Sequence, residues 1–173
     1  MKTNPVTFAI LLAIAAGNFS TMLCAADTKS SLNSTDEKFV KQAGAAGMAE
    51  VKIATLGTQK AERADVKNFA TMLVTDHTKA NAELTALAEA KKVELSAVIN
   101  PDSAGMFKDL EKESGKDFDK AFLDHLESSH KESISTFEDA EKNAADGEVK
   151  SFASATLPVL RTHLNKIKEM AAK

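Results

Sequence analysis

The stretch "ATMLVTDHTKANAELTAL", residues 70–87, carries apolar residues at the spacing of an α-helix. Ala or Leu recurs on one face, at Ala70, Leu73, Ala80, Leu84 and Leu87. A period near 3.6 residues predicts an amphipathic helix with this face buried. His77 lies in the middle of the same face, where an aliphatic residue would be expected. Because burying an unpaired polar group is costly, the ring needs a partner.

The composition favours helices over strands. The chain has 173 residues, of which 43% are hydrophobic and only 5% aromatic, with three Pro and seven Gly. Strands draw on β-branched and aromatic residues, so this mixture predicts an all-α protein of one domain. The net charge is −3 and no basic patch is present, so nucleic acid is not expected as a partner.

The N-terminus has the layout of a secretory signal peptide. Lys2 precedes an apolar run from Val6 to Ala16, and small residues follow it. We predict a signal peptide over residues 1–26 with cleavage after Ala26, and therefore a periplasmic or secreted protein. The run is too short to span a bilayer, which takes about 20 apolar residues. No other segment is expected to cross a membrane, so the mature chain has no integral membrane segment.

Cys24 has two interpretations that the sequence leaves open. On the first it is removed with the signal peptide, and the mature chain has no cysteine and no thiolate chemistry. On the second it carries a lipid at the mature N-terminus, although the preceding "TML" is a poor match to a lipoprotein signal.

The remaining chain is predicted to be a flexible leader, residues 27–35, and a helical domain, residues 36–173. Ser34 and Glu37 have the spacing of a capping box at the start of the first helix. The periodicity predicts four long helices and a short one, over residues 36–59, 65–92, 103–115, 116–143 and 148–172.

The links between these helices predict the topology. Short links join the first to the second long helix and the third to the fourth, which favours antiparallel hairpins. The link of about 23 residues between the hairpins is long enough to run the length of a bundle. We therefore predict a ferritin-like four-helix bundle, in which two hairpins are joined by a long crossover that contains the short helix. A simple up-and-down bundle is the alternative.

Each long helix places one ionisable residue on its apolar face, at Glu50, His77, His130 and His163. All four lie roughly 12–15 residues from the helix start, which corresponds to a spread of about 5 Å in height. They are therefore predicted to converge near the centre of the bundle. His125 lies about 140° around the helix from His130, so we expect it at the surface or boundary.

Three neutral imidazoles and a carboxylate suit one Zn, Cu, Ni or Fe ion. The alternative is a buried hydrogen-bond network without metal, in a non-catalytic structural, interaction or stress protein of the cell envelope. A di-iron oxidase is less favoured, because such sites use four Glu with two Glu-x-x-His pairs. The chain has one such spacing, Glu127 to His130.

Four segments together resemble a known family. "DEKFVKQAGAAGMAEVKIATL", "DVKNFATMLVTDHTKANAEL", "SGKDFDKAFLDHLESSHKESISTFEDA" and "VKSFASATLPVLRTHL" are similar, in order and spacing, to segments of a bacterial exported family. It is the domain of unknown function 4142, often labelled an outer-membrane or exported protein with a ferritin-like bundle. The family's motif positions fall on Glu50, Asp76, His77, His130 and His163. The resemblance implies the fold and export. It implies no activity, so we do not expect a turnover enzyme.

Overall fold

The computed structural model describes residues 29–173, and the predicted signal peptide with Cys24 lies outside the described residues. This part of the chain forms five helices and no strand, which confirms the all-α prediction. The helices are α1 (Ser34–Lys60), α2 (Ala64–Ala90), α3 (Pro101–Lys112), α4 (Gly115–Asn143) and α5 (Gly147–Ala171). Among the described residues, no helix has the length and apolar character needed to cross a membrane.

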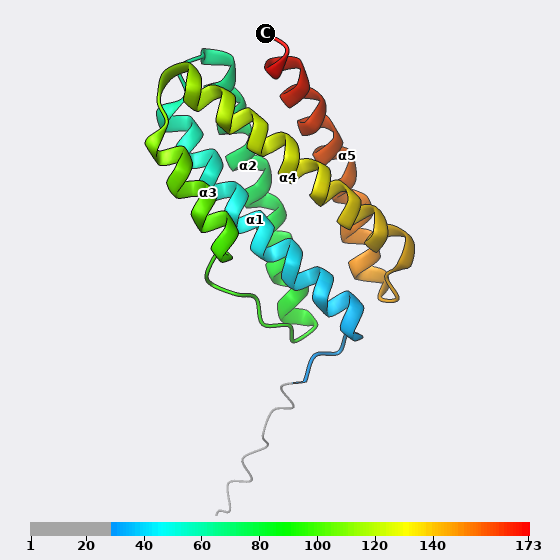
Figure 1. Cartoon of the computed structure of the whole chain (residues 1–173). Coiled ribbons are helices and arrows are strands. Elements are labelled where there is room, and N and C mark those ends of the chain that lie inside the picture. Colours follow the sequence, from blue (N-terminus) through cyan, green and yellow to red (C-terminus); the bar gives the residue numbers. More distant parts are fainter. Residues whose placement is uncertain (1–28) are drawn as a thin grey trace, which may run out of the picture.

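The helices form two antiparallel hairpins, α1–α2 and α4–α5, as Figure 1 shows. Helix α3 runs back along the outside of α1, so α4 starts at the same end of the bundle as α2. The hairpins pack through α1 against α4 and through α2 against α5. The link between them is therefore the predicted crossover of a ferritin-like topology, and the simple up-and-down alternative is wrong.

The cap of α1 differs from the predicted capping box. Asn33 is the N-cap, and its side-chain oxygen accepts hydrogen bonds from the backbone N–H groups of Thr35 and Asp36, at 2.8 and 2.9 Å. Ser34 already lies inside the helix, so it cannot cap it. Ser31, within the predicted leader, donates its backbone N–H to the carbonyl of Lys91 at the end of α2. The helical domain thus begins before residue 36.

Two buried carboxylates join the hairpins reciprocally. Asp119 of α4 accepts hydrogen bonds from the backbone N–H groups of Glu62 and Arg63, in the α1–α2 turn, at 3.0 and 2.9 Å. Asp36 of α1 accepts from Ala145 and Asp146, in the α4–α5 turn, at 3.1 and 2.8 Å. Each hairpin therefore accepts hydrogen bonds from the backbone N–H groups in the turn of the other hairpin, and this fixes their relative register.

The apolar core consists of two clusters separated by a polar layer. One cluster, around Phe118 and Phe122, fills the end of the bundle that holds the α1–α2 turn. The other, around Phe39 and Phe137, fills the opposite end. On every long helix, the residues of one cluster precede the ionisable residue of the apolar face and the residues of the other cluster follow it. These ionisable residues are Glu50, His77, His130 and His163.

The hairpin contacts give the first prediction. Asp119→Ala leaves two turn N–H groups without their acceptor, so we expect the free energy of unfolding to fall by about 2–4 kcal/mol. Urea denaturation measures this change. Asp124→Ala is the matched control, because Asp124 of the same helix makes only an exposed pair with Lys120, worth about 0.5 kcal/mol. Equal losses in the two variants would contradict the proposed role of Asp119.

Candidate metal centre

Three histidines from three helices meet in the polar layer. His77 comes from α2, His130 from α4 and His163 from α5. One ring nitrogen of each lies within 4.8 Å of those of the other two. The side chains are 8%, 1% and 1% exposed, so all three are removed from solvent. The structure thus brings together three of the four residues that the sequence placed at this depth.

His130 is held in one tautomer by the backbone. Its Nδ1 lies 2.9 Å from the carbonyl oxygen of Leu126, one turn earlier in α4. A carbonyl oxygen only accepts, so Nδ1 carries the proton and the neutral ring has its lone pair on Nε2. That lone pair is directed to His163, whose Nδ1 lies 3.4 Å away.

His163 is held in the opposite tautomer by a carboxylate. Its Nε2 lies 2.9 Å from Oδ2 of Asp76, which also only accepts. Burial lowers the pKa of His163, against the opposing effect of Asp76, so the ring is neutral near pH 7. Nε2 then carries the single proton, and Nδ1 has the lone pair that faces His130.

His77 completes the cluster and has an unpaired nitrogen. Its Nε2 is buried and has no hydrogen-bond partner among the described residues. The ring centroid lies 5.6 Å from that of His130 and 5.4 Å from that of His163. Burial is the main cause that lowers the pKa of His77 to about 4, and the neighbouring imidazoles add to it. The ring is therefore neutral at physiological pH.

Two acceptors face each other in the cluster. With the protons on Nδ1 of His130 and Nε2 of His163, His130 Nε2 and His163 Nδ1 face each other as lone pairs, and His77 Nε2 has no partner among the described residues. Buried lone pairs that face one another are unfavourable unless something positive lies between them. A metal ion is such a group, and metal-bound histidines usually donate their other nitrogen to a carbonyl or carboxylate, as both His130 and His163 do here.

Glu50 lies beside the cluster but outside it. Its Oε1 accepts a hydrogen bond from Ser129 and is 3.9 Å from His130 Nδ1, the nitrogen already bonded to Leu126. Its Oε2 is buried without a hydrogen-bond partner in the described part of the chain. Glu50 therefore faces the back of the His130 ring, and the structure does not place it as a fourth member of the histidine group.

The sequence does not predict which residues orient the rings. Asp76 lies off the apolar stripe, and the family resemblance marks its position without giving it a role. Ser129 and the Leu126 carbonyl gave no signal, because their roles depend on which nitrogen faces them. His125 is half-buried and outside the cluster, as expected. Glu127 pairs with Lys131 at 2.7 Å, which removes support for a Glu-x-x-His site.

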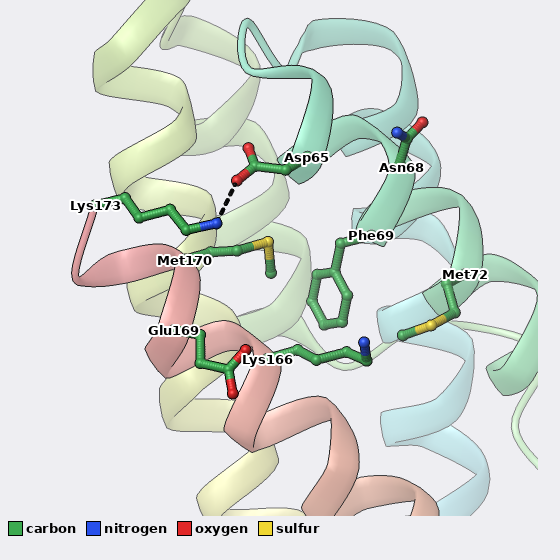
Figure 2. Close-up of a pocket in the computed structure, with 8 residues that line it drawn as sticks. All are labelled: Asp65, Asn68, Phe69, Met72, Lys166, Glu169, Met170 and Lys173. Carbon is green, nitrogen blue, oxygen red and sulfur yellow. Dashed lines mark hydrogen bonds and ion pairs between the residues drawn. The ribbon is translucent and has the colours of Figure 1, made fainter.

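Two hollows lie between α2 and α5. The larger, about 360 Å³, is lined by Phe69, Met170 and charged residues that include Asp65 and Lys173, which form an ion pair (Figure 2). Phe69 packs edge-on against His163, with centroids 6.1 Å apart, so it separates this hollow from the cluster. The smaller hollow, about 290 Å³, is lined by Asp76 and His163 themselves. This hollow therefore borders the hydrogen-bonded pair of Asp76 and His163.

The chain belongs to the family described as Domain of unknown function (DUF4142), whose model matches residues 21–170. No curated protein matches it. Two solved structures are similar in fold. A DUF305 fragment from Deinococcus radiodurans has 12% identity and a TM-score of 0.73, covering 82% of this chain and 97% of its own. CopM in the Cu(II)-bound form has 15% identity and a TM-score of 0.68, and the match covers 79% of this chain and 95% of CopM. At these identities the likeness shows the fold alone.

The buried neutral rings predict a pH-dependent stability. In the unfolded chain His77 titrates near pH 6.5 and in the folded chain near 4, so the unfolded state binds more protons between these values. Stability of the metal-free protein should therefore fall as pH decreases from 6.5 to 4, by roughly 3 kcal/mol for His77 alone. His77→Leu should remove that part of the slope, measured by urea denaturation with a chelator present. An unchanged slope in His77→Leu would contradict a neutral buried ring.

Proposed function

We propose that this DUF4142 protein binds one divalent transition-metal ion between His77, His130 and His163. The proposal is carried by one observation. The protons of His130 and His163 are held on the outer side of the rings by Leu126 and Asp76, so the inner nitrogens present lone pairs to a common point. His77 adds a third ring nitrogen within 4.8 Å of the other two, and its Nε2 is buried without a partner among the described residues.

The donor set indicates which ions fit. Three imidazole nitrogens with no thiolate suit Zn(II), Cu(II) and Ni(II), and are a poor match for Ca(II) or Mg(II), which prefer oxygen ligands. Three protein ligands leave one position for water or another small ligand. CopM was solved in its Cu(II)-bound form, which makes Cu(II) the first ion to test.

The surrounding charges support a divalent ion. Neutral imidazoles cannot compensate a double positive charge between two apolar clusters, and the burial of an uncompensated ion is costly. Asp76 lies against His163 at 2.9 Å, and Glu50 lies 3.9 Å from Nδ1 of His130. These two carboxylates would balance the charge through the rings without replacing a nitrogen ligand.

The alternative is a buried polar network that stabilises the bundle and binds no metal. The contact between His163 and Asp76 is consistent with it, since that nitrogen is satisfied without an ion. The unpaired nitrogen of His77 and the facing acceptors of His130 and His163 favour the metal instead. We therefore propose metal binding, without a catalytic reaction.

Metal titration tests the proposal. Untagged protein, stripped with a chelator and titrated with Cu(II) or Zn(II) by calorimetry, should bind one ion per chain. His130→Ala should weaken binding at least about 100-fold, because it removes one of the three ligands. His125→Ala is the matched control, since it removes a histidine of the same helix outside the cluster, and it should bind like the unmodified protein.

Two outcomes would contradict metal binding. One is the absence of stoichiometric binding for every ion tested. The other is equal binding by His130→Ala and His125→Ala, which would assign the metal to a surface histidine. If the His130→Ala variant also loses its helical circular dichroism, His77→Gln tests the same point with a side chain of similar length.

Asp76 gives a separate prediction about positioning. Asp76→Ala removes the acceptor that holds the proton on Nε2 of His163, so metal affinity should fall about 10- to 100-fold. Asp76→Asn should lose less, because the amide oxygen can still accept that hydrogen bond. Glu169→Gln, an exposed carboxylate of α5 outside the cluster, serves as control. Competition with a chromophoric chelator measures all three, and unchanged affinity in Asp76→Ala would exclude the positioning role.

A further inference from the structure

A groove of about 600 Å³ runs between α1 and α4 and is bordered by the start of α3. We call it the α1–α4 groove. Its α1 side is made largely of alanines, including Ala45, Ala46 and Ala49, and its α4 side carries the hydroxyl groups of Ser129 and Ser133. The volume lies in the range of small-molecule sites in proteins. Small side chains on one helix and hydroxyls on the other leave it both open and partly polar.

Glu50 lies in the lining of this groove and has unused hydrogen-bonding capacity. The residue is only 5% exposed, its Oε1 accepts from Ser129, and its Oε2 has no hydrogen-bond partner in the part of the chain that the structure describes. A buried carboxylate with an unpaired oxygen is costly unless a donor reaches it. The adjacent His130 nitrogen does not provide one, because its proton goes to the Leu126 carbonyl.

The charges around the groove favour a cation. Asp102 and Glu132 lie in its lining together with Glu50, and Lys41 is the basic residue there. The Lys41 ammonium group pairs with Glu37 at 2.5 Å, on its own helix. Burial lowers the pKa of His125, so this ring does not add positive charge near pH 7. The carboxylates therefore outnumber the positive charges and create a negative potential in the groove.

We propose that the α1–α4 groove binds a small organic cation, a primary ammonium or guanidinium group on a short alkyl chain. The charged end donates to Oε2 of Glu50, which is closed to solvent in the unliganded structure and turns toward the groove on binding, and the alkyl chain packs on the alanines of α1. A charge-assisted hydrogen bond to a desolvated carboxylate is among the stronger polar contacts in proteins. The hydroxyl of Ser133 can accept a second hydrogen from the same cation.

A metal ion is a poorer occupant of the groove than an organic cation. Within residues 29–173 the one set of three metal-ligating side chains close enough to share an ion is the histidine cluster. Glu50 alone offers too few ligands for a bound metal. An ammonium group, in contrast, brings its own three donors and needs only one carboxylate and neighbouring hydroxyls. This site does not rest on metal binding at the histidines, so either can fail without the other.

NMR titration of the metal-free protein tests the site. The probe is n-butylammonium at constant ionic strength, and n-butanol is its neutral control. We expect saturable shifts of backbone amides in residues 45–53 and 125–133 with n-butylammonium alone. Glu50→Gln should weaken binding at least about tenfold, since it removes the charge that the cation needs. Glu138→Gln removes an α4 carboxylate that pairs with Arg161 outside the groove, and it should leave binding unchanged.

A second variant separates binding from folding. Ala46→Leu fills the groove without altering Glu50, so it should abolish the saturable shifts while the helical circular dichroism is retained. Three results would overturn the proposal. They are non-saturating shifts in the unmodified protein, equal binding by n-butanol, and undiminished binding in both Glu50→Gln and Ala46→Leu.

Discussion

The structure depends on a polar layer that crosses an apolar bundle at mid-height. Each long helix contributes one ionisable side chain to this layer, and an apolar cluster lies on either side of it. Such a layer is unfavourable unless its members satisfy one another or hold a further group. Leu126, Asp76 and Ser129 satisfy outer atoms of His130, His163 and Glu50, while the facing nitrogens of His130 and His163 are both acceptors and Nε2 of His77 has no partner in the described part of the chain. Apart from Oε2 of Glu50, the unmet hydrogen-bonding capacity of the layer therefore lies at the histidines.

The frame that holds this layer is the reciprocal bonding of the hairpin turns. His77 belongs to the first hairpin, whereas His130 and His163 belong to the second, so their convergence requires a fixed register between the two. Asp36 and Asp119 supply that register from opposite ends of the bundle, each by accepting from the turn of the other hairpin. A shift of one helical turn is about 5.4 Å, more than the 4.8 Å that separates the ligand atoms at most. The hydrogen bonds at the two turns thus fix the register that brings the three histidines together.

Most of the fold could be predicted from sequence, because apolar periodicity and link lengths report directly on helices and their order. The convergence of His77, His130 and His163 followed from their equal depth in the helices. The position of the Glu50 carboxylate could not be predicted in this way, because depth in the helix does not determine which side of a neighbouring ring a flexible side chain occupies. In the structure Ser129 donates a hydrogen bond to Glu50 on the outer side of the His130 ring. The sequence also could not distinguish Asn33 from Ser34 as the N-cap of α1, because both residue types accept hydrogen bonds from backbone N–H groups. Only the backbone conformation shows that the helix begins directly after Asn33.

The most direct measurement of the central claim is X-ray absorption spectroscopy on the protein loaded with one equivalent of Cu(II) or Zn(II). Binding between the three rings predicts a first shell dominated by nitrogen at about 2.0–2.1 Å, with the outer-shell scattering of three imidazoles. His125→Ala should give the same spectrum, and His130→Ala should not. A first shell of oxygen atoms with one imidazole or none would contradict the account, since it would place the metal on surface carboxylates and leave the polar layer as a hydrogen-bond network.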